Sequence, residues 1–218
     1  MKRNMLSSIL LLLAIVSVAR AGTEAYKVVM SKNKALCRGM LKLFNQDMKE
    51  QGFIRYDQHE AFRQVSWEPV ELAGPKPMVK YCSLLQKTIV DLNNDGKREL
   101  VVKTSFCLRS QTSDSLYIFP ADSNVLEKAS WGDMKLLFDT PNKFHRTGDV
   151  YSLTELNLAS NERGHEAIGG VFIIQPFLWG NVAYISMTDL HQEWIVIAKY
   201  LQGEELQDIC YFRGKSLS

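Results

Sequence analysis

The sequence lacks the short motifs that carry many enzyme activities. It contains no G-x-S-x-G nucleophile elbow, no phosphate-binding P-loop and no G-x-G-x-x-G dinucleotide-binding pattern. Catalytic groups can still meet from distant parts of a chain, so these absences disfavour an enzyme without excluding one. No C-x-x-C pair is present either, which argues against a zinc ribbon and a thioredoxin-like redox site.

The chain also lacks a charge excess of either sign. It has 26 lysine and arginine residues against 24 aspartate and glutamate residues. Three of the basic residues (Lys2, Arg3 and Arg20) fall within the first 21 residues, where no acidic residue occurs. The rest of the chain is therefore close to neutral, and nothing in it indicates a nucleic-acid-binding surface.

Long apolar runs are missing after the N-terminal segment, which has the three parts of a secretory signal. Lys2 and Arg3 are followed by an apolar stretch at 6–18 and by an A-x-A cleavage site at 19–21. The apolar stretch is shorter than the about 20 residues that span a bilayer. We therefore predict a signal peptide at 1–21, a single exported domain at 22–218 with no transmembrane segment, and a periplasmic or secreted location.

One polar stretch has residue types and spacing that specify a chemistry. It reads D-x-N-x-D-G-x-x-E and carries side-chain oxygens on Asp91, Asn93, Asp95 and Glu99. A glycine at its sixth position allows the chain to turn back, and the Lys97 carbonyl would then point inward. Calcium prefers six to eight oxygen ligands, so the sequence predicts a Ca²⁺ site formed by these five residues.

The flanks of this loop exclude an EF-hand. That motif needs a bidentate glutamate at position 12, where this chain has Val102, and it needs helices on both sides. Here β-branched residues flank the loop, which predicts a strand–loop–strand unit. A metal-free turn remains the alternative, because Asn and Asp side chains can close such a turn themselves.

The hairpin resembles one repeat of the FG-GAP/VCBS type. The resemblance rests on I-V-D-L-N-N-D-G at 89–96 followed by E-L-V-V at 99–102, with 115–119 as an outer strand. It covers about 30 residues and implies a blade-like hairpin of the integrin-α type with calcium in its loop. That family usually has Asp where this chain has Glu99.

Four cysteines (Cys37, Cys82, Cys107 and Cys210) in an exported chain predict two disulfides. If the turn is centred between residues 94 and 95, Cys82 and Cys107 lie opposite each other on the hairpin, so we predict that they are bonded. The second predicted disulfide, Cys37–Cys210, would join an N-terminal helix to the last strand.

Hydrophobic periodicity predicts the remaining elements. Residues 31–51 form a helix with Ser31 as N-cap and Gly52 after its end. Short strands are expected at 134–138 and 150–153, and four strands at 171–177, 182–187, 194–200 and 209–212 form an antiparallel meander. The sequence therefore predicts an α+β fold that is mainly antiparallel β, with propeller-blade-like hairpins, a C-terminal meander and one N-terminal helix packed on it.

A faint internal repeat relates the strands at 99–119 to those at 194–212. Two such units are too few for a closed propeller, so a reduced sheet assembly is expected. Two His-Glu pairs, at His59 and His165, lack the spacing that places two imidazoles on one helix face, and we interpret them as solvated surface.

Two classes of function fit these features. The first is an exported binding protein, or an inhibitor or immunity-type protein, with a protein or glycan partner in the cell envelope. The second is an exported hydrolase, which a histidine within hydrogen-bond reach of a carboxylate in a cleft would favour.

Overall fold

The computed structural model describes residues 25–75, 84–108, 111–131, 145–147, 172–189, 193–201 and 205–214. The expected signal peptide, the strands expected at 134–138 and 150–153, Cys82 and His165 lie outside these ranges. In the described part of the chain, no helix is long and apolar enough to cross a membrane.

One long helix, three short helical elements and ten strands make up the described structure. The helical elements are α1 (Lys34–Gln51), η1 (Tyr56–Gln58), α2 (Glu60–Arg63) and α3 (Val125–Lys128). The strands are β1 (Tyr26–Ser31), β2 (Glu68–Pro69), β3 (Leu84–Val90), β4 (Glu99–Leu108), β5 (Gln111–Pro120), β6 (His145–Thr147), β7 (Phe172–Trp179), β8 (Val182–Asp189), β9 (Trp194–Leu201) and β10 (Glu205–Gly214).

The larger sheet contains the predicted C-terminal meander. Its strands follow the order β1-β10-β9-β8-β7 with antiparallel neighbours, and β6 pairs in parallel with β10. β7 and β8 are joined by a two-residue turn, Gly180-Asn181, in which both residues have positive φ. Such turns match the twist of a hairpin. The α+β class and the meander are therefore confirmed.

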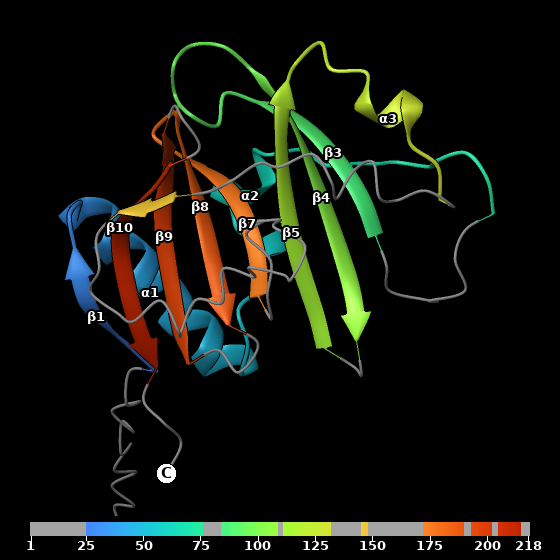
Figure 1. Cartoon of the computed structure of the whole chain (residues 1–218). Coiled ribbons are helices and arrows are strands. Elements are labelled where there is room, and N and C mark those ends of the chain that lie inside the picture. The colour runs from blue at the N-terminus through green and yellow to red at the C-terminus, as the bar shows by residue number, and fades with distance from the viewer. Residues whose placement is uncertain are drawn as a thin grey trace, which may run out of the picture.

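The smaller sheet has the order β2-β3-β4-β5 and includes the hairpin around the acidic loop. Thr88 pairs with Val101 and Val90 with Glu99, which is the register the sequence predicts. Continuation of this register would place Cys82 opposite Cys107, and that disulfide stays a prediction. The two sheets lie next to each other without closing into a propeller (Figure 1).

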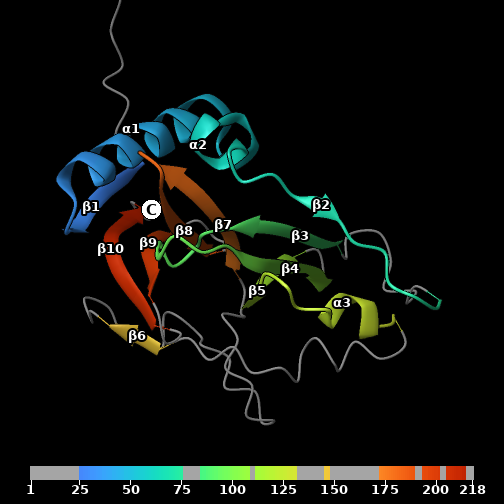
Figure 2. The same ribbon diagram turned by 90° about the horizontal axis from the view of Figure 1, so that it is seen from above.

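Three apolar clusters arrange these elements in layers. One lies between the sheets and includes Val101 and Leu116 of the smaller sheet with Ile185 and Val196 of the larger one. A second joins α1 to the opposite face of the larger sheet, and a third covers the outer face of the smaller sheet. Figure 2 shows α1 and α2 on one side of the larger sheet and α3 beside the smaller one.

The N-terminal boundary of α1 differs from the prediction. Ser31 is paired with Cys210 at the end of β1, so it cannot cap the helix. Asn33 is the N-cap, and its side-chain oxygen accepts a hydrogen bond from the Leu36 N–H at 3.1 Å. The predicted end is correct, since Gly52 adopts a left-handed conformation and its N–H bonds the Met48 carbonyl.

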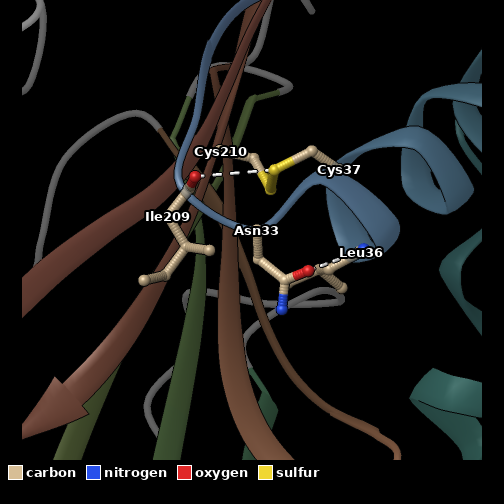
Figure 3. The surroundings of a disulfide bond; sticks show 5 residues. All are labelled: Asn33, Leu36, Cys37, Ile209 and Cys210. Carbon is tan, nitrogen blue, oxygen red and sulfur yellow. Dashed lines mark hydrogen bonds between the residues drawn. A yellow bond between two sulfur atoms is a disulfide. The ribbon is translucent and has the colours of Figure 1, made fainter.

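A disulfide between Cys37 and Cys210 joins α1 to β10, as predicted (Figure 3). The two Cα atoms are 5.6 Å apart, and both residues are buried. The Cys37 sulfur also lies 3.5 Å from the Ile209 carbonyl oxygen, which is a van der Waals contact because a disulfide sulfur carries no proton. The covalent bond therefore fixes the helix on the sheet.

Tyr56 of η1 is buried against the ring of Phe62 on α2, and its hydroxyl contacts the Thr188 and Ser186 hydroxyls of β8. Burial raises the pKa of Tyr56 to about 12, although both hydroxyl contacts oppose this shift. The unfolded chain loses this proton near pH 10, so stability that is present below about pH 10 is lost as the pH rises toward about 12.

We expect Tyr56→Phe to be less stable than wild type by about 1 kcal/mol at neutral pH, because it loses the hydroxyl contacts. Between about pH 9 and about pH 12 the free energy of unfolding of wild type should fall by about 2 to 3 kcal/mol relative to that of the variant, so the variant becomes the more stable protein. Urea unfolding of both proteins across this range measures the change. A difference that is independent of pH would show that Tyr56 does not titrate differently in the folded state.

Candidate metal centre

The acidic loop leaves β3 at Val90 and returns to β4 at Glu99. Two residues in it have positive φ, Asn94 at 64° and Gly96 at 88°. Asparagine tolerates this conformation better than most residues, and glycine has no Cβ to oppose it. The chain can therefore reverse twice within a few residues, which brings alternate side chains to one side.

Side-chain oxygens inside the loop accept hydrogen bonds from its own backbone. Asp91 accepts from the Asp95 and Gly96 N–H groups at 3.0 and 2.9 Å, and Asn93 accepts from the Asp95 N–H at 2.9 Å. Asp95 in turn accepts from the Lys97 N–H at 2.7 Å. These bonds fix the side chains and satisfy most of the loop's inner N–H groups.

Three carboxylates converge at this loop. One oxygen each from Asp91, Asp95 and Glu99 lies within 4.8 Å of the other two. Calcium binds oxygen at about 2.3 to 2.6 Å, so a single ion between these atoms can contact all three. The structure thus brings together three of the five predicted ligands. The contributions of Asn93 and of the Lys97 carbonyl stay predictions.

Glu99 closes the loop on the β4 side. Its carboxylate accepts a hydrogen bond from the Leu92 N–H at 2.7 Å. Burial raises the pKa of Glu99 above its ordinary value, the charges of Asp91 and Asp95 raise it further, and backbone hydrogen bonds oppose this shift. The three negative charges disfavour one another in the absence of a cation, and a bound divalent ion would remove that repulsion.

The same loop is attached to the larger sheet, which the sequence analysis missed. The Asn94 side chain accepts a hydrogen bond from the Ala183 N–H at 2.7 Å and donates to the Ala183 carbonyl at 3.3 Å. Leu92 is fully buried in the cluster between the sheets. An isolated leucine inside an otherwise polar loop was the available signal for this attachment.

Two substitutions at Asn94 distinguish the stability that its side-chain hydrogen bonds contribute from the cost of its backbone conformation. Asn94→Gly keeps the positive φ but removes the bonds to Ala183, and we expect it to lower the free energy of unfolding by about 1 to 2 kcal/mol. Asn94→Ala should lower it by about 1 kcal/mol more, because alanine disfavours this φ. Urea unfolding measures both. Equal stability of Asn94→Gly and wild type would mean that the bonds to β8 contribute nothing.

The interpretation of His59 as solvated surface is wrong. Its Nε2 atom lies 2.7 Å from a carboxylate oxygen of Asp47, and its side chain is only 20% exposed. The same Asp47 oxygen accepts a hydrogen bond from the Arg55 N–H at 2.8 Å. Asp47 is buried on α1, so its carboxylate needs such partners, and the pair joins α1 to the segment before α2.

His59 also lines a shallow hollow of about 430 Å³ together with Leu43, Gln64 and Trp179. The lining residues in the described part of the chain include no serine, threonine or cysteine. The hollow therefore has a histidine–carboxylate pair without a hydroxyl or thiol nucleophile beside it.

Comparison with known proteins finds no similar protein. No protein-family model, curated protein or solved structure matches the chain.

Proposed function

We propose that this protein is an exported binding or inhibitory protein whose D-x-N-x-D-G loop binds Ca²⁺. The observation that carries the proposal is the convergence of Asp91, Asp95 and Glu99 within 4.8 Å. Asn93 and the Lys97 carbonyl complete the ligand set, in the pattern of the FG-GAP/VCBS-type loop that this hairpin resembles. The Cys37–Cys210 disulfide supports an oxidising compartment outside the cytoplasm.

In this account calcium stabilises the contact between the two sheets. Asp91 and Asp95 belong to the loop whose Asn94 bonds the backbone of Ala183. An ion that holds the loop in one conformation therefore also holds Asn94 against β8. The result is a rigid surface for a protein or glycan partner in the cell envelope, and rigidity lowers the entropy lost on binding.

Calcium should raise the thermal stability of the wild-type protein. An ion that binds only the folded state stabilises it by about 2.7 kcal/mol at about 100 times its dissociation constant. For a chain of this size that corresponds to about 5 to 10 °C in Tm. Thermal melts in excess calcium and in excess EGTA, at equal ionic strength, measure the shift.

Two variants make this test specific. Asp95→Asn should remove the calcium-dependent shift, because it deletes one of the three converging carboxylates. Asp122→Asn, which changes an exposed acid in the turn after β5, should keep the full shift. Identical melts of wild type in calcium and EGTA would instead support the metal-free turn.

The alternative function is an exported hydrolase, and the His59–Asp47 pair is the observation that favours it. In such an enzyme His59 would activate a water molecule, since the hollow around it has no hydroxyl or thiol among its described lining residues. Hydrolysis of p-nitrophenyl acetate by wild type and His59→Gln separates the two functions. A binding protein should show no turnover that depends on His59, whereas a hydrolase should lose most of its activity in the variant.

A further inference from the structure

A second site lies between the two sheets, away from the acidic loop. Lys103 of β4 points into the interior, and its side chain is only 7% exposed. Ordinary lysines keep their ammonium group in water, because a buried charge is costly unless it is paired and hydrogen-bonded. The interactions available to this buried ammonium group therefore indicate what the site can bind.

Within the ranges that the structure describes, the partners of the Lys103 ammonium group are few and distant. The nearest carboxylate oxygen of a described residue, on Asp114, is 4.0 Å from Lys103 Nζ, which is too far for a hydrogen bond. Asp114 instead accepts from the Ser105 hydroxyl at 2.5 Å and from the Ile174 N–H at 2.9 Å. Among the described residues, the Lys103 ammonium donates one long hydrogen bond, to the Gln175 side-chain oxygen at 3.4 Å.

An ammonium group has three N–H donors, and the described part of the chain accepts from one of them, which leaves donors for a further acceptor. The ring of Trp67 lies beside it, with its centroid 5.1 Å from Nζ, and supplies a cation–π contact but no acceptor atom. Burial lowers the pKa of Lys103, and the charge of Asp114 only partly opposes this shift. Among the described residues, the closest acceptor for the ammonium group is the Gln175 side-chain oxygen at 3.4 Å.

Lys103 also lines a cavity of about 280 Å³. One side of the cavity is apolar, with Phe62, Val65 and Trp67. The exposed Arg63 brings a second cation to its rim, while the exposed Asp57 brings an acid. The cavity thus combines a buried cation, a rim cation and an apolar wall, and it is large enough only for a small molecule.

We propose that this cavity binds a small monocarboxylic acid with an apolar body, whose carboxylate accepts hydrogen bonds from Lys103 and Arg63 and whose apolar part packs against Trp67. The formal charges of Lys103 and Arg63 are balanced by those of Asp114 and Asp57, so the preference for a carboxylate comes from the N–H donors of Lys103 that no described residue accepts from. A divalent cation would be repelled by Lys103. The site is independent of calcium and would remain if the acidic loop bound no metal.

Benzoate is a suitable probe, and neutral benzamide is its matched control. In ¹H–¹⁵N NMR titrations of wild type, benzoate should shift the Trp67 indole N–H in a saturable way, with Trp67→Phe used to assign that signal. Benzamide should bind at least about tenfold more weakly than benzoate, because it offers no charge-assisted hydrogen bond to the ammonium. Absence of a saturable shift with benzoate would overturn the proposal.

Lys103→Met tests the residue itself, with Lys128→Met on the exposed surface of α3 as control. The first should weaken benzoate binding about tenfold or more, and the second should leave it unchanged. Equal binding by Lys103→Met and wild type would also overturn the proposal.

A measurement on wild type covers the case in which Lys103→Met fails to fold. The ¹³Cε chemical shift of Lys103 reports its titration, and bound benzoate should raise the pKa of this amine, because a nearby carboxylate favours the ammonium form. A titration midpoint that benzoate does not move would show that the carboxylate does not contact Lys103.

Discussion

Replacing Cys37 and Cys210 together with alanine is expected to lower the free energy of unfolding by about 5 kcal/mol. The two residues are separated by 173 positions, so the bond closes most of the chain into a loop and strongly restricts the unfolded state. Both side chains are buried, which adds a small loss of packing. Urea unfolding of the double variant and wild type under non-reducing conditions measures the difference.

The double variant leaves the predicted Cys82–Cys107 disulfide in place, so its effect belongs to Cys37–Cys210 alone. Non-reducing peptide mapping of wild type should give peptides linked through both predicted pairs. A loss below about 1 kcal/mol would contradict the entropic argument, and a peptide that joins Cys82 to Cys210 would contradict the hairpin assignment.

Phe44→Ala should have the next largest effect, a loss of about 3 to 5 kcal/mol. Phe44 is fully buried where α1 packs on the larger sheet. Its ring makes edge-on contacts with Tyr26, Tyr56 and Phe212, with centroids 5.6 to 6.5 Å apart. Removing the ring leaves a cavity between α1 and the sheet. The disulfide restrains α1 from shifting to fill this cavity, so collapse should relieve little of the loss.

Phe53→Ala is the matched control, because Phe53 follows the same helix and is 50% exposed. Its loss should stay within about 0.5 kcal/mol. Similar losses for the two variants would show that α1 is not held on the sheet mainly by the cluster around Phe44.

Local sequence patterns were enough to predict several parts of the fold. Helical periodicity marked α1, and β-branched runs marked the strands from β7 to β10. The hairpin register was predicted from the centre of the acidic loop, because pairing on both sides of a turn depends only on distance along the chain. The disulfide Cys37–Cys210 then followed from the cysteines that the hairpin left over.

Features that depend on distant contacts were not predicted. β1 has mostly exposed residues and no alternating pattern, and it is a strand because it pairs with β10. That pairing takes Ser31 out of the helix and makes Asn33 the cap. The Asn94–Ala183 bonds likewise join residues 89 positions apart, and no local pattern encodes them.

The two candidate sites also differ in whether a local sequence pattern predicts them. The acidic loop could be predicted because its candidate ligands are alternate residues of one turn. The burial of Lys103 could not be predicted, because a polar residue in a strand usually lies on the solvent face of a sheet. Its burial results from the packing of β7 beside β5, where the Ile174 N–H bonds Asp114.

The most direct test of the calcium site is isothermal titration calorimetry of the purified protein with CaCl₂. We predict one saturable site with a dissociation constant of about 10⁻⁵ to 10⁻³ M, lost in Asp95→Asn and retained in Asp122→Asn. A wild-type protein that takes up no calcium in this range, or an Asp95→Asn variant that binds as wild type does, would contradict the account.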